Sequence, residues 1–213
     1  MVKQAGKPTG KYGVSLALDM TKHHTPSVQW AIKNIFADGS FTKKIKILDI
    51  GCGAGTGINI FNKNFKNARF YGIDYSKDMV ELTKETHKEL IKNNRLEVHH
   101  ASVDKLPFDD NMFQLVIGIE TSHFWLDKKE GLAEIKRVLE INGLIVLVNE
   151  VYMYPDYERF LPKLQVNAVK LDKVKVYTEK QYKEILQEAG FQDIKIHTCP
   201  DKGWISIVAK KPE

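Results

Sequence analysis

Short apolar runs alternate with amphipathic stretches along most of this 213-residue chain. Runs of five to seven apolar and β-branched residues predict strands, because buried parallel strands carry hydrophobic side chains on both faces. The predicted strands are 45–50, 69–74, 96–100, 115–119, 144–148, 191–197 and 204–209. Helical spacing of apolar residues predicts helices over 25–36, 56–65, 76–91, 132–139 and 178–189. The alternation of strands and helices predicts a doubly wound α/β domain.

Three segments refine this pattern. Only a turn at 200–203 separates the last two strands, which predicts an antiparallel hairpin at an edge of the sheet. Asn142 and Gly143 are expected to end the helix that precedes the fifth strand. Residues 151–177 show no clean period, so we predict an irregular insertion there.

The N-terminal residues differ from the rest in composition. Residues 1–20 are rich in glycine and lysine and predict a loosely held arm. Thr25 and Pro26 predict the start of the first helix, as an N-cap followed by proline in the first turn. We therefore expect an arm over 1–25 and a single domain over 26–213.

The charge and the cysteine content limit the setting of the protein. The formal net charge is +5, but lysines are interleaved with acidic residues, which argues against a nucleic-acid-binding face. Two cysteines, Cys52 and Cys199, argue against a disulfide framework and favour a reducing cytoplasm. No apolar stretch is long enough for a signal peptide or a membrane span, so we expect no membrane association.

The strand at 45–50 leads directly into a loop with glycines at alternating positions, 51, 53, 55 and 57. Glycine lets the backbone approach a ligand with φ > 0, and the free N–H groups of the next helix attract an anion. A dinucleotide loop needs a third glycine where this chain has Thr56. Asp49, two residues before the first glycine, suits an ammonium group better than a diphosphate. The loop therefore favours a ligand with an amine and a carboxylate on one carbon.

Asp74 ends the second predicted strand, 23 residues after Gly51. A carboxylate at this position accepts hydrogen bonds from ribose hydroxyls. That role is compatible with a nicotinamide dinucleotide and with an adenosyl sulfonium, so Asp74 alone does not decide between them.

Four segments in order resemble the class I S-adenosylmethionine-dependent methyltransferases, in particular their small-molecule, type 11-like branch. They are 49–55 (Asp-Ile-Gly-Cys-Gly-Ala-Gly), 71–76 (Tyr-Gly-Ile-Asp-Tyr-Ser), 101–113 and 135–143. The resemblance covers most of the chain and implies a Rossmann-like three-layer sandwich. Its sheet would be mostly parallel and seven-stranded, with an antiparallel C-terminal hairpin. It also implies S-adenosylmethionine as cofactor and methyl transfer to a small-molecule acceptor by in-line displacement.

The resemblance assigns roles to individual residues. Asp49 would bind the amino group of the cofactor, Asp74 would bind the ribose, and Met79 would pack on the adenine. An ordinary core position is the alternative for Met79. The residues expected at the cofactor are Asp49, Gly51, Cys52, Gly53, Asp74, Tyr75, Met79, Ser102, Val103 and Glu120. Ser102 departs from the family, which often has an aspartate facing the adenine amino group. Residues 140–143, Glu-Ile-Asn-Gly, replace the usual Lys-Pro-Gly-Gly turn.

The ends of the fourth and fifth strands hold the candidate catalytic residues. We expect Glu120 and Glu150 to bind a cationic acceptor or to share a proton, and His123 to act as a base. Alternatively, Glu120 seats the cofactor through its backbone and His123 is a hydrogen-bonded polar residue. No metal is expected, because His23 and His24 are adjacent and no cysteine–histidine cluster exists.

Two segments are candidates for a lid: 20–24 together with Trp30, and the insertion at 151–177.

Three other functions stay open. A nucleic-acid methyltransferase is disfavoured because 120–123 reads Glu-Thr-Ser-His, where the amino-methylating branch has an Asn/Asp-Pro-Pro-aromatic run. The two other functions are a non-catalytic module that binds the cofactor and a nicotinamide dehydrogenase. The sequence does not indicate an oligomeric state.

Overall fold

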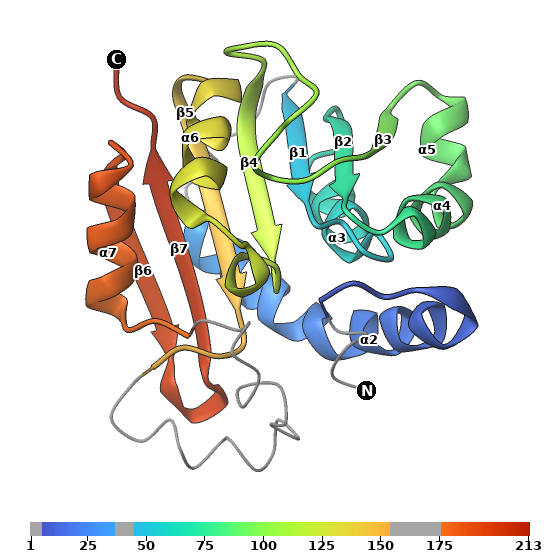
Figure 1. The fold of residues 1–213 in the computed structure, drawn as a ribbon, viewed down its shortest axis with the longest axis horizontal. Helices are drawn as coiled ribbons and strands as arrows, with labels where there is room; N and C mark the ends of the chain where they lie inside the picture. Colours follow the sequence, from blue (N-terminus) through green and yellow to red (C-terminus); the bar gives the residue numbers. More distant parts are fainter. Residues whose placement is uncertain (1–5, 37–44, 154–175) are drawn as a thin grey trace.

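The computed structural model describes residues 6–36, 45–153 and 176–213. Its centre is a seven-stranded sheet with the strand order β3-β2-β1-β4-β5-β7-β6 (Figure 1). The strands are β1 (Lys46–Ile50), β2 (Arg69–Asp74), β3 (Leu96–His100), β4 (Phe113–Ile119), β5 (Leu139–Asn149), β6 (Gln192–Cys199) and β7 (Trp204–Lys210). The first five strands pair in parallel, whereas β7 is antiparallel to both β5 and β6. This confirms the predicted sheet and its C-terminal hairpin.

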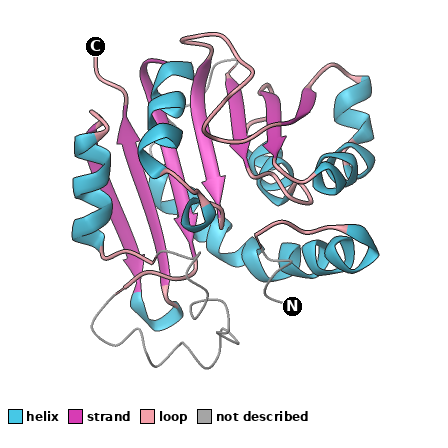
Figure 2. Ribbon diagram, viewed as in Figure 1, coloured by secondary structure: helices cyan, strands magenta, loops and turns pink. Residues whose placement is uncertain are grey.

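Helices cover both faces of the sheet and complete three layers (Figure 2). They are α2 (Gly10–Ile35), α3 (Thr56–Asn64), α4 (Lys77–Thr86), α5 (Lys88–Lys92), α6 (Lys128–Val138) and α7 (Glu179–Glu188). Helices α2 and α3 pack on one face, and α6 and α7 pack on the other. None of the helices in the described ranges is both long enough and apolar enough to span a bilayer.

The central strands are buried on both sides, as their uninterrupted apolar runs predict. In β1, Ile47 belongs to the core beneath α2 and α3, whereas Leu48 and Ile50 belong to the core beneath α6 and α7. This alternation follows from the two-residue period of a strand. The sheet is therefore held rigidly from both faces, and its carboxyl edge is a fixed platform for the loops that follow β1, β2, β4 and β5.

The N-terminal prediction was wrong in one respect. Helix α2 begins at Gly10 and continues through Pro26, so Thr25 and Pro26 are not its start, and residues 10–20 are not a loose arm. Residues 1–5 of the predicted arm lie outside the described residues. In the N-terminal half of α2 the apolar residues lie at 12, 14, 16–18 and 20, which is not helical spacing, so the sequence does not indicate a helix there. It is held instead by polar contacts to other parts of the chain, which are described with the site below.

Two further boundaries differ from prediction. Helix α6 ends at Val138, and Asn142 and Gly143 lie inside β5, so they do not end the helix. Asn142 has a left-handed φ of 65°, and its N–H donates to the carbonyl of Lys211 at 3.0 Å. The pair therefore lies where β5 shifts its register against β4, between Leu139 and Leu144. The helix predicted over 76–91 is divided at His87 into α4 and α5.

The predicted insertion at 151–177 lies largely outside the described residues. At its base, the Met153 N–H donates to the carbonyl of Tyr177 at 2.9 Å. Helix α7 follows at once, with a capping box between Thr178 and Gln181. Met153 and Tyr177, on either side of this segment, therefore lie next to each other.

Candidate functional site

The site is a loop between β1 and α3 at the carboxyl edge of the sheet. Here β1 lies between β2 and β4, so the strand order reverses, and such a switch point is where open α/β sheets bind ligands. Gly51, Gly53 and Gly55 have φ values of 67°, 56° and 81°. A Cβ on Gly51 would lie 2.4 Å from Thr121 Oγ1, at the end of β4. The backbone at Gly51 therefore requires glycine for conformation and for space.

Asp74 connects this loop to the end of β2. Its Oδ2 accepts the Gly53 N–H at 2.9 Å, and its Oδ1 accepts the Ser76 N–H at 2.8 Å. Thr83 on α4 donates to the Gly53 carbonyl at 2.6 Å. Burial raises the pKa of Asp74, while these backbone donors counteract the rise. The carboxylate is fixed at the rim with lone pairs left to accept further hydrogen bonds.

Asp49 is the most strongly perturbed acid at this edge. It is 2% exposed, and its Oδ2 has no hydrogen-bond partner among the described residues. Burial, together with the negative charge of Asp74, raises the pKa of Asp49 to about 8. A Cβ on Gly57 would lie 2.5 Å from this Oδ2, so the glycine makes room for the carboxyl group. An orphaned buried acceptor beside a glycine cradle fits the ammonium group of an amino acid.

The other residues expected at the cofactor fall into two groups. Cys52 and Met79 are buried, and burial raises the pKa of the Cys52 thiol well above its ordinary value, so the thiol is neutral. Val103 is also buried and packs toward Gly131 of α6. Tyr75 is 50% exposed and Ser102 is half-buried, each beyond the end of a strand. Contact of these side chains with the cofactor stays a prediction.

Residues 6–10 cross this edge of the sheet, and we call them the N-terminal strap. At one end, a Cβ on Gly6 would lie 3.0 Å from the ring of Phe124, in the 3-10 helix η1 (Ser122–Phe124) after β4. The ammonium group of Lys7 lies 4.0 Å from the centre of the Tyr75 ring, beyond β2. The strap therefore spans from the end of β4 to the end of β2.

The strap is anchored again where it enters α2. Ser76, the residue before α4, donates its hydroxyl to the carbonyl of Pro8. The Gly10 N–H donates to Asp78 Oδ2 at 2.6 Å. Ser76 is the N-cap residue of α4, but its hydroxyl makes this strap contact and no side-chain cap bond. Sequence reasoning missed the strap, because its polar contacts leave no periodic signal.

Three titratable side chains meet where β4 and β5 end beneath α2. Glu120 follows β4 with a left-handed φ of 53°, and its Oε1 accepts the N–H of Glu150. His24 Nδ1 lies 3.1 Å from Glu150 Oε2. Burial raises the pKa of Glu120 to about 7, and the charge of Glu150 adds to that rise, while His24 opposes it. Glu120 and Glu150 thus lie next to each other, as predicted, and His24 lies beside them.

His123 lies in η1, the 3-10 helix that follows β4. Burial, together with the positive charges of Lys128 and His24, lowers the pKa of His123 to about 4, against a hydrogen bond with Asn149 that would raise it. Ser122 donates to Asn149 Oδ1 at 3.2 Å, and Asn149 donates to the hydroxyl of Tyr182 at 3.2 Å. His123 is therefore neutral at neutral pH and a weak base, and its hydrogen bond agrees with the alternative of a satisfied polar residue.

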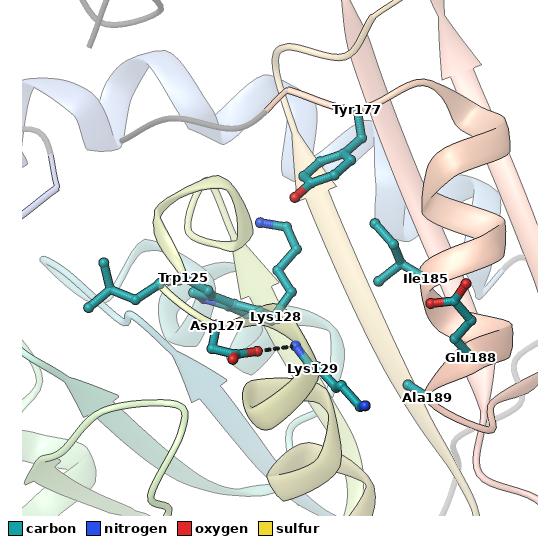
Figure 3. Close-up of a pocket in the computed structure, with 9 residues that line it drawn as sticks. Trp125, Asp127, Lys128, Lys129, Tyr177, Ile185, Glu188 and Ala189 are labelled. Carbon is teal, nitrogen blue, oxygen red and sulfur yellow. Dashed lines mark hydrogen bonds between the residues drawn. The ribbon is translucent and has the colours of Figure 1, made fainter. Parts of the chain in front are cut away.

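A shallow cavity of about 550 Å³ opens between the start of α6 and α7 (Figure 3). Trp125, Lys128 and Tyr177 line one side of the cavity, and Ile185 and Glu188 of α7 line the other. Lys128 points toward Tyr177, and its ammonium group lies 4.8 Å from the ring centre. The cavity has no residue of the glycine loop in its wall, so it is separate from the switch-point site.

Together, the strand order, the reversed last strand and the glycine loop define a Rossmann-like methyltransferase fold. Residues 48–147 match the family model described as a methyltransferase domain. Residues 48–147 therefore form a methyltransferase domain of the class I, type 11 kind, for which S-adenosylmethionine is the methyl donor.

Three known proteins illustrate this relationship. A fatty-acid O-methyltransferase of Mycolicibacterium smegmatis is 29% identical over 118 residues, 54% of this chain and 42% of that protein. A SAM-dependent methyltransferase from Aquifex aeolicus superposes with a TM-score of 0.68 at 20% identity, covering 91% of this chain and 97% of that one. Phosphoethanolamine N-methyltransferase 2 of Haemonchus contortus, in complex with S-adenosyl-L-methionine, gives a TM-score of 0.66 at 17% identity, covering 87% and 52%. The chain spans 63%, 42% and 46% of the length of three curated relatives that it matches.

Proposed function

We propose that this protein transfers a methyl group from S-adenosylmethionine to a small-molecule acceptor by in-line displacement. The observation that supports this best is the buried Oδ2 of Asp49, which has no hydrogen-bond partner among the described residues and lies beside the glycine cradle. Asp49 would hold the amino group of the cofactor, Gly51 and Gly53 would admit its methionine part, and Asp74 would hold the ribose. When bound, the cofactor supplies a methyl group on a sulfonium, whose leaving group is neutral.

The protein's own contribution is to orient the acceptor and to exclude water. Proximity and orientation supply up to about 7–11 kcal/mol of a barrier when the geometry is near ideal. Glu120 lies at the end of β4, next to the residue that touches the glycine loop, and we assign it to the acceptor or the methyl region. A carboxyl group with a pKa near 7 either receives a proton or binds a cationic acceptor. Protonation of His123 is so unfavourable that we assign it a supporting role in the acceptor wall.

The type of acceptor can be tested directly. The wild-type protein is incubated with S-adenosylmethionine and separate pools of fatty acids, hydroquinones, small amines and transfer RNA, and release of S-adenosylhomocysteine is measured. We expect release with one of the small-molecule pools. Release only with RNA would establish the nucleic-acid alternative, whereas cofactor binding without release on any pool would favour a non-catalytic module.

We also propose a cytoplasmic setting. Cys52 and Cys199 are both free, and Cys52 is buried next to the ligand loop. Free thiols of this kind are typical of reducing compartments. The acceptor is then a metabolite of the same compartment.

We propose that the N-terminal strap covers the cofactor. Removing residues 1–9 should speed the release of S-adenosylhomocysteine by about tenfold, corresponding to the loss of about 1.4 kcal/mol of contacts. Stopped-flow displacement of the bound product by excess S-adenosylmethionine measures this rate. K7A, which removes only the contact with Tyr75, is expected to give a smaller increase. An unchanged rate in the truncated protein would show that the strap is not a cover.

A further inference from the structure

Helix α2 presents three polar side chains to the ends of the strands. Thr21 Oγ1 lies 3.0 Å from Thr56 Oγ1, in the first turn of α3 beside the glycine loop. Ser27 donates to Glu150 Oε1 at 2.9 Å. His24 lies between them, about 4.5 Å along the helix axis from each at 1.5 Å per residue. The Thr21 contact therefore puts His24 one turn from the part of the loop expected to hold the methionine end of the cofactor.

The surroundings of His24 resemble those of a general base. Its Nδ1 faces Glu150 Oε2 at 3.1 Å, and Ser27 fixes the other oxygen of the same carboxylate. Both ring nitrogens are buried and neither makes a hydrogen bond within the described part of the chain, so Glu150 holds Nδ1 by a charge contact while Nε2 has no partner there. The side chain is only 16% exposed. An imidazole that is oriented by a carboxylate on one nitrogen and free on the other is the arrangement that catalytic histidines use to accept a proton.

We propose that His24, oriented by Glu150, is the general base that takes the proton of the methyl acceptor. This inference rests on the proposed function. The acceptor's oxygen or nitrogen forms a bond to the methyl carbon, the carbon–sulfur bond breaks with its electron pair on sulfur, and the acceptor's proton moves to His24 Nε2. The products are the methylated acceptor, neutral S-adenosylhomocysteine and a protonated His24, which then returns the proton to solvent.

The charges around His24 favour this role over one for His123. Burial alone would lower the pKa of His24, but its close contact with Glu150 and the charges of Glu120 and Glu150 outweigh burial and raise it. The groups that face His24 are Glu150 after β5, Glu120 after β4, and His123 in η1. His123, with its pKa near 4, is far less able to hold a proton. His24 is thus suited to accept a proton, whereas His123 is suited to remain neutral.

The position of His24 can be tested without knowing the acceptor. Histidine C–H resonances are titrated by NMR in complexes with S-adenosylhomocysteine and with sinefungin, which carries an amine where the cofactor carries its methyl group. H24Q assigns the signal. If His24 faces the transferred methyl group, the ammonium of sinefungin should lower the titration midpoint of His24 by roughly one pH unit relative to the S-adenosylhomocysteine complex. His23, adjacent but exposed, should not change.

Two variants complete the test. E150Q should lower the His24 midpoint in the unliganded protein, because the orienting charge is lost, while S27A should lower it less. Equal His24 midpoints in the two complexes, or a midpoint insensitive to E150Q, would overturn the proposal. If S-adenosylhomocysteine did not bind the wild-type protein at all, the proposed function itself would fail. If it bound with no response at His24, only the assignment of the base would fail.

Discussion

Replacement of Gly51 by alanine is expected to weaken the binding of S-adenosylhomocysteine at least 100-fold, the largest effect that a single methyl group should have in this protein. The new Cβ would lie 2.4 Å from Thr121 Oγ1, and the residue has a φ of 67°. A left-handed conformation costs a non-glycine residue about 1–2 kcal/mol. The clash with Thr121 adds to this cost, so the loop must move away from the position in which it fits the cofactor. Isothermal titration calorimetry measures the change.

The control for this experiment is Gly190→Ala. Gly190 also has a left-handed φ, of 79°, but it follows α7, and a Cβ there meets only the end of the Lys136 side chain. This variant should lose a similar amount of conformational stability and keep its affinity for the ligand. If G51A bound as tightly as the wild type, the loop between β1 and α3 would not be the cofactor site.

The second large effect concerns Asp49, whose substitution by asparagine should stabilise the free protein while weakening cofactor binding. Between the unfolded pKa of 3.8 and the folded value of about 8, the folded Asp49 retains a proton that the unfolded chain releases. The stability of the free protein therefore falls as pH rises through this window and is lowest, for this group, above it. At pH 8 the asparagine variant should be more stable by a few kcal/mol, on the order of 5 at most. At pH 4 the difference should nearly vanish.

Binding should respond in the opposite direction. The amide of D49N cannot neutralise the ammonium group of the ligand, and the loss of one partner of a buried charge pair costs about 2–5 kcal/mol, or at least about 30-fold in affinity. Urea unfolding at pH 4 and pH 8, together with calorimetry of S-adenosylhomocysteine, measures both effects. D19N, at an exposed carboxylate of α2, is the control and should change neither. A D49N protein that is less stable at pH 8, or that binds as tightly as wild type, would contradict this account of the site.

The central sheet could be predicted from the sequence because its strands are apolar on both faces. The runs that end at Ile50 and Ile119 are buried between two layers of helices, and their composition leaves no other structure with comparable burial. The glycine loop could also be predicted from the sequence, because Gly51 has a conformation that other residues adopt only with strain. The location of Asp49 and Asp74 at the carboxyl edge of the sheet could be predicted because each lies at the end of an apolar strand.

The parts that sequence could not predict depend on long-range polar contacts. The first half of α2 is stabilised through residues such as Thr21 and Gly10, whose partners on α3 and α4 are distant in sequence. His24 was for the same reason treated only as part of a lid segment, because its pairing with Glu150 requires α2 to lie over the end of β5. Asn142 is typical of a helix terminator, but its left-handed conformation lies within β5, where the register against β4 shifts.

The hydrogen bond between Met153 and Tyr177 has a consequence for how this protein can diversify. It joins the two points between which the chain departs from the sheet, so a change in the number or kind of residues between them need not disturb β5 or α7. The residues between Met153 and Tyr177 can therefore be replaced, in evolution or by design, while β1, β2 and the loops that follow them stay unchanged.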